Sequence, residues 1–172
     1  LWDKQFGFLK EILVAPVSRT GIMAGKTLGT VTTSMVKAGV FLVALLALKL
    51  ARPDPAGVLI AVIFMFLISA SFTSLGIAFA SQMKYPHGFQ LIMNFLIMPI
   101  FFLSGALFPL EGQPQWLTFL THLNPLTYGV DGLRYALGAS RQFSQAMSMA
   151  ALALFWACAT LAGTVLFGRM AA

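Results

Sequence analysis

Residues 55–83 form an uninterrupted apolar stretch without a single charged residue or histidine. A helix of this length can cross a bilayer, because each residue adds about 1.5 Å and the hydrocarbon core is about 30 Å thick. Two further stretches, residues 88–109 and 144–168, are also uncharged. Hydrophobic residues make up 59% of the chain and charged residues 9%, against about 25% charged in soluble domains. The sequence therefore predicts an integral membrane protein.

Residues 27–48 form another predicted span, although Lys37 lies inside it. A lysine at the bilayer centre costs about 2.5–3.5 kcal/mol on insertion scales. Lys37 either faces other helices or water, or the span begins later and the lysine lies near the surface. Both alternatives stay open, and Lys37 is a candidate pathway or interface charge.

The expected fold is an all-α, polytopic transmembrane bundle with about four spans. It forms a single transmembrane domain over residues 1–172. Its segments are a surface region at 1–26, three spans within 27–109, an external re-entrant region at 110–143, and a last span at 144–168.

The surface region begins with an amphipathic pattern. Trp2, Phe6, Leu9 and Leu13 recur at helical spacing, which is typical of a helix that lies on a membrane surface. Pro16 is expected to end this helix, because its ring cannot continue a helix interior.

The external region is expected to hold two short helices in or near the outer membrane interface. Asn124 and Pro125 suit the start of the second one, as a cap and as the first helical residue. Asp131 and Arg134 are three residues apart, close enough to pair on one helix. In the preceding span, Pro99 and the pair Ser104–Gly105 predict a kink or interruption.

The loop charges indicate cytoplasmic termini, since basic residues are enriched on the cytoplasmic side. With the predicted spans, the side of the termini carries six lysines and arginines and the other side carries four.

Several function classes are disfavoured. Gly25-Lys26-Thr27 resembles the end of a phosphate-binding loop, but Thr20 stands where that motif needs glycine. His87 and His122 lie on opposite sides of the predicted membrane, so they cannot share a metal. Cys158 is interpreted as a small packing residue. The scattered basic residues do not predict nucleic-acid binding, and neither a catalytic centre nor a cofactor site is expected.

Two segments together resemble the permease subunits of ABC-2 type ATP-binding cassette exporters, especially the daunorubicin-resistance and nodulation-factor type. They are DKQFGFLKEILVAPVSRTGIMAGKTLG (3–29) and FFLSGALFPLEGQPQWLTFLTHLNPLTYGVDGLR (101–134). Such permeases have about six spans, so the resemblance implies a chain without the first two.

The resemblance implies roles for two groups of residues. The first group is an ATPase-coupling helix at residues 3–19, with Glu11, Pro16 and Arg19. The second is the external re-entrant motif, with Asn124, Pro125, Tyr128, Asp131 and Arg134. For this second group a structural role is favoured: a helix cap, a tyrosine at the membrane interface, and a local ion pair.

The resemblance also implies partners: an ATPase subunit that binds the ATP, a second permease copy in a homo- or heterodimer, and membrane lipids. The low charge of the spans fits a bulky, amphipathic or lipid-like solute better than an ion, and the resemblance implies a drug-like, lipid-like or saccharide substrate. One rival is a lipid-modifying enzyme that uses His122, Asp131 and Arg134, although no nucleophile accompanies them. Another is a membrane assembly subunit that transports nothing.

Overall fold

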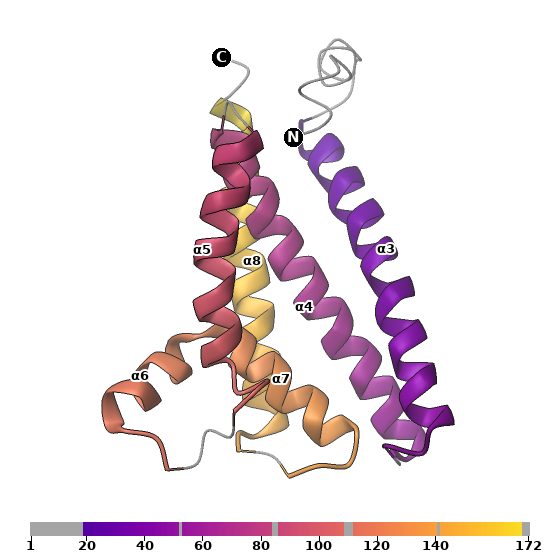
Figure 1. Cartoon of the computed structure of the whole chain (residues 1–172). Coiled ribbons are helices and arrows are strands. Elements are labelled where there is room, and N and C mark those ends of the chain that lie inside the picture. Colours follow the sequence, from indigo (N-terminus) through magenta and orange to yellow (C-terminus); the bar gives the residue numbers. More distant parts are fainter. Residues whose placement is uncertain (1–18, 52, 84–85, 109–111, 141, 170–172) are drawn as a thin grey trace.

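The computed structural model describes residues 19–51, 53–83, 86–108, 112–140 and 142–169, and all of its regular elements in these ranges are helices. The expected all-α fold is confirmed. Figure 1 shows the helices, which are α3 (Arg19–Ala47), α4 (Pro55–Gln82), α5 (Pro86–Leu103), α6 (Gln115–Leu123), α7 (Pro125–Ala136) and α8 (Gln145–Arg169).

Three of these helices, α3, α4 and α8, are long and apolar enough to cross a membrane. Their candidate membrane spans are Ala24–Ala47, Pro55–Gln82 and Gln145–Leu166. Helix α5 corresponds to the other predicted span, but it has 18 residues and ends at Leu103, well before Pro109. The chain turns at Ser104, and Gly105 adopts a left-handed φ of 76°. The predicted interruption at Ser104–Gly105 is therefore confirmed.

Helix α3 begins earlier than the sequence predicts. A surface region was expected up to residue 26, yet α3 starts at Arg19 and runs without a break to Ala47. The range 19–47 contains no proline, and isolated glycines weaken a helix without ending it. The predicted amphipathic helix before Pro16 lies outside the described residues.

Helix α4 is central, and α8 runs beside it in the same direction (Figure 1). Their contact is built around the buried side chains of Phe64, Leu67 and Leu152. Small residues let two membrane helices approach closely, and the predicted contact residues Ala159 and Gly163 are both buried on α8.

Helix α7 crosses α4 at glycines. A Cβ on Gly132 would collide with the ring of Phe64, and one on Gly129 would lie 2.7 Å from the Ile68 side chain. Only glycine allows α7 to lie this close to α4. These close contacts hold α7 next to the C-terminal end of α5 and the N-terminal end of α8 (Figure 1).

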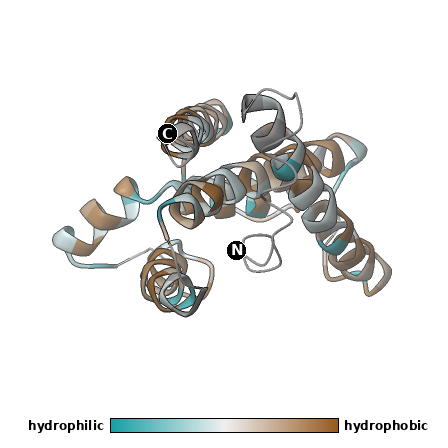
Figure 2. Cartoon of the chain, turned by 90° about the horizontal axis from the view of Figure 1, so that it is seen from above, coloured by the Kyte–Doolittle hydropathy of each residue, from teal (hydrophilic) through white to brown (hydrophobic). Residues whose placement is uncertain are grey.

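Large apolar side chains also cover the outside of the bundle. Figure 2 shows hydrophobic residues on the outward sides of the long helices, and the side chains of Phe41 and Phe95 are 72% and 84% exposed. A soluble protein would seldom expose apolar surface on this scale, whereas lipid accepts it.

Candidate functional site

The site begins where α5 ends. The backbone N–H of Ser104 turns back to the carbonyl of Phe101 at 3.2 Å instead of continuing the α-helical pattern to Ile100. The Ser104 hydroxyl also donates to Phe101, at 2.6 Å. The last carbonyls of a helix have no partner within it. The carbonyls at the end of α5 therefore need partners from elsewhere.

Helix α7 supplies these partners through its side chains. Asn124 donates to the carbonyl of Ile100 at 2.6 Å, and Thr127 donates to that of Leu103 at 3.4 Å. Together they satisfy carbonyls of the last turn of α5.

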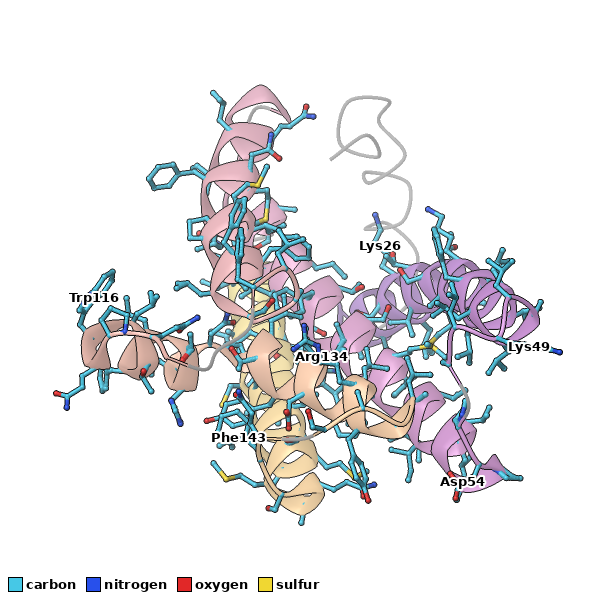
Figure 3. All side chains as sticks on the ribbon, turned by 60° about the horizontal axis from the view of Figure 1, so that its bottom comes forward. Lys26, Lys49, Asp54, Trp116, Arg134 and Phe143 are labelled. Atoms are coloured by element: carbon cyan, nitrogen blue, oxygen red, sulfur yellow. The ribbon has the colours of Figure 1, made fainter. Side chains whose placement is uncertain are left out.

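Arg134 continues the same contact onto the turn that follows α5. Its Nη2 donates to the carbonyl of Gly105 at 2.6 Å and lies 3.5 Å from that of Ala106. Figure 3 shows Arg134 where the end of α5 meets α7. Its positive charge also suits the negative end of the α5 dipole.

Asn124 starts α7 as the sequence predicts. Its Oδ1 accepts from the backbone N–H of Leu126 at 3.0 Å, and Pro125 occupies the first turn. Because the Oδ1 caps α7 while the Nδ2 caps α5, this side chain joins the two helices.

The predicted ion pair between Asp131 and Arg134 is wrong. The buried carboxylate of Asp131 accepts from the backbone N–H groups of Gln142 and Phe143, at 2.8 and 3.1 Å. The two side chains thus bind different segments: Arg134 holds the turn after α5, and Asp131 holds the loop before α8. Each charged side chain binds backbone groups that have no other partner among the described residues, and these bonds replace the ion pair between the two side chains.

Tyr128 is buried, and its expected place at the membrane interface stays a prediction. Its hydroxyl donates to the carbonyl of His122 at 2.8 Å, which ties the end of α6 to α7. The rings of Tyr128 and His122 both pack on Phe143, with centroids 4.9 and 5.2 Å away. Tyr128 and Phe143 therefore join α6, α7 and the loop before α8.

Lys37 lies well inside the span Ala24–Ala47, with an exposed side chain. Both expectations for Lys37, a contact with other helices or water and a position near the membrane surface, stay predictions. Cys158 is also exposed on the surface of this chain, and its interpretation as a small packing residue stays a prediction.

The proposed coupling residues remain predictions. Glu11 and Pro16 lie outside the described residues, and Arg19 is the first residue of α3. Sequence reasoning missed the contacts of α7 with α5, because nothing in the local sequence shows which distant carbonyls need donors.

Comparison with known proteins places this architecture in a family. Residues 1–138 match the model of the ABC-2 type transporter family. The chain is 30% identical over 138 residues to a putative transport permease, ycf38, of Porphyra purpurea, covering 78% of this chain and 47% of that protein. It is 28% identical over 127 residues to the inner membrane transport permease YadH of Escherichia coli K12, covering 74% and 49%.

The chain spans about half the length of these relatives. The match includes α3 to α7 and the contact between α5 and α7 described above. The chain belongs to the ABC-2 type transporter family.

Proposed function

We propose that this permease is the membrane-spanning subunit of an exporter driven by a separate ATPase subunit. A second permease copy, identical or related, would complete the pathway. The substrate class is a drug-like, lipid-like or saccharide molecule. Family membership and the apolar spans support a transport role, and ATP would be bound by the partner subunit alone.

The continuity of α3 is the observation that carries this proposal. Its first residue, Arg19, ends the segment proposed to dock the ATPase, and the helix runs unbroken to Ala47 on the opposite side of the predicted membrane. A continuous helix transmits a displacement at one end to the other. An ATPase that pushes on residues 3–19 would therefore move α3 as one body.

That movement would reach the bundle through α4. Val31 and Leu42 on α3 are buried, at 3% and 6% exposure, and α3 packs on α4. Helix α4 in turn holds α7 at the two glycine contacts, and α7 holds the end of α5. Packed helices of this kind favour a change between discrete arrangements, as alternating access requires.

The coupling step can be tested by reversing a charge in the docking segment. In the permease assembled with its ATPase in nanodiscs, Glu11→Lys should weaken co-purification of the ATPase about tenfold, equivalent to about 1.4 kcal/mol of binding. ATP-driven transport should fall with it. Glu111→Lys makes the same charge change on the predicted external side, so it is the matched control and should leave ATPase binding intact.

Two results would count against the proposal. If Glu11→Lys left both ATPase binding and transport unchanged, the docking segment would be wrongly assigned. If no cassette ATPase co-purified with the unaltered permease from its native membrane, a transport role driven by ATP would be excluded.

A further inference from the structure

A groove of about 730 Å³ opens between α3, α4 and α5. Phe72 and Ile77 of α4 and Ile97 of α5 form apolar parts of its walls, and Leu126 and Leu133 of α7 lie at one end. Binding sites for small molecules usually measure about 300–1,000 Å³ and are mostly apolar. The groove has the size and lining of such a site.

Four hydroxyl groups from two helices line this groove. Thr30 and Ser34 belong to α3, and Ser69 and Thr73 belong to α4. In the part of the chain that the structure describes, none of these hydroxyls has a hydrogen-bond partner. The oxygen of Ser69 is moreover shielded from the surroundings by its neighbours.

Neighbouring hydroxyls on α3 behave differently. Thr32 donates to the carbonyl of Leu28 at 2.8 Å, and Thr33 donates to that of Gly29 at 3.0 Å. The hydroxyls of these two threonines therefore have their hydrogen-bond partners within α3 itself. The hydroxyls of Thr30 and Ser34, which line the groove from the same helix, form no such bond within the described residues.

This arrangement specifies the chemistry of an occupant. At membrane depth little water competes, so a hydroxyl without a partner costs free energy. A ligand with oxygen atoms along one side would satisfy the hydroxyls of Thr30, Ser34 and Thr73, whereas the shielded oxygen of Ser69 is out of its reach. Its apolar body would lie against Phe72, Ile77 and Ile97. Among the described residues, none that lines the groove is ionisable, so these residues would leave a charged group uncompensated.

We propose that the groove between α3, α4 and α5 is a binding site for a neutral amphiphile that carries several oxygen atoms, such as an acylglycerol. Gly76 leaves room for it, since nothing lies within 4 Å of a Cβ built at that residue. Binding at the groove does not require an ATPase, so it can be tested separately from the transport proposal.

The test uses the assembled permease in nanodiscs and two photoactivatable lipids with the same diazirine-bearing acyl chain. One is a neutral diacylglycerol and the other an anionic phosphatidylglycerol. Mass spectrometry then maps the labelled residues. The diacylglycerol should label the groove-facing parts of α3 and α4 at least about tenfold more than phosphatidylglycerol does, a difference of about 1.4 kcal/mol.

Matched variants locate the site. Thr30→Val combined with Thr73→Val removes two groove hydroxyls with little change of shape and should reduce diacylglycerol labelling severalfold. Thr33→Val removes a hydroxyl that is satisfied within α3 and should not. Gly76→Leu fills the groove and should abolish labelling, whereas Gly39→Leu, which also meets nothing within 4 Å, should not.

Three outcomes would overturn the proposal. Equal labelling by both lipids would mean that the groove is ordinary lipid-facing surface. Absence of labelling, with groove cysteines forming cross-links to another protein helix, would show a helix as the occupant. Labelling that persists in Gly76→Leu, in a variant whose thermal unfolding is unchanged, would place the lipid elsewhere.

Discussion

The side-chain amide of Asn124 donates to the carbonyl oxygen of Ile100 at 2.6 Å, while its oxygen accepts from Leu126 at 3.0 Å. Asn124 therefore provides a hydrogen-bond partner both for a carbonyl at the end of α5 and for an N–H group at the start of α7. The groups joined in this way are backbone groups at helix ends, which otherwise lack partners. The stability of this region should depend strongly on Asn124.

Replacement of Asn124 by alanine should destabilise the purified permease by about 2–4 kcal/mol, since it removes a cap and leaves a carbonyl unsatisfied. Asn124→Asp separates the two roles: the carboxylate still caps α7 but repels the Ile100 carbonyl. It should remain destabilised in thermal unfolding followed by size-exclusion chromatography in detergent. An Asn124→Asp variant as stable as the parent would show that the Ile100 contact contributes nothing.

Asp131 and Arg134 provide a second prediction, because they bind different backbone groups. Asp131→Asn and Arg134→Ala should each lower stability, and their effects should add within about 0.5 kcal/mol in the double variant. An ion pair between the two side chains would instead give a clear coupling energy. A double-mutant cycle by chemical unfolding measures this difference.

Gly132 should tolerate no side chain. A Cβ there would collide with Phe64, so Gly132→Ala should destabilise by about 1–3 kcal/mol through overpacking. Gly39→Ala is the control in another helix, where a Cβ meets nothing within 4 Å. It should be neutral or stabilise by up to about 1 kcal/mol, because alanine favours helix. Equal thermal unfolding of the two variants would contradict the close packing of α7 on α4.

Ser74 and Thr160 form a hydrogen bond between α4 and α8, at 3.1 Å between their hydroxyl oxygens. Interhelical hydrogen bonds in membranes contribute about 0.6 kcal/mol on average. A cycle of Ser74→Ala and Thr160→Val should therefore give a coupling of about that size in steric-trap unfolding. A coupling near zero would show that the contact is dispensable.

Local chemistry allowed part of this architecture to be predicted. The cap at Asn124, the proline after it and the break at Ser104–Gly105 all follow from properties of neighbouring residues. The long apolar stretches likewise predicted helices, since in lipid every backbone group must be satisfied within the helix.

The failures have a different cause. The pairing of Asp131 with Arg134 was inferred from their spacing, which shows only that two side chains can meet. Their actual partners lie in segments before and after α7, and their free backbone groups became apparent only from the fold. The predicted span began at residue 27, whereas the helix itself already starts at Arg19, because nothing between these two positions ends a helix.

The unequal lengths of the spans also affect the surrounding bilayer. Helix α5 has 18 residues and α4 has 28, so their lengths are about 27 and 42 Å. A bilayer of uniform thickness cannot match both, even though α4 leans within the bundle (Figure 1). A helix shorter than the hydrocarbon core is accommodated by a thinner bilayer, by snorkelling of flanking residues or by contact with another protein. We therefore expect the stability of this protein to depend on bilayer thickness.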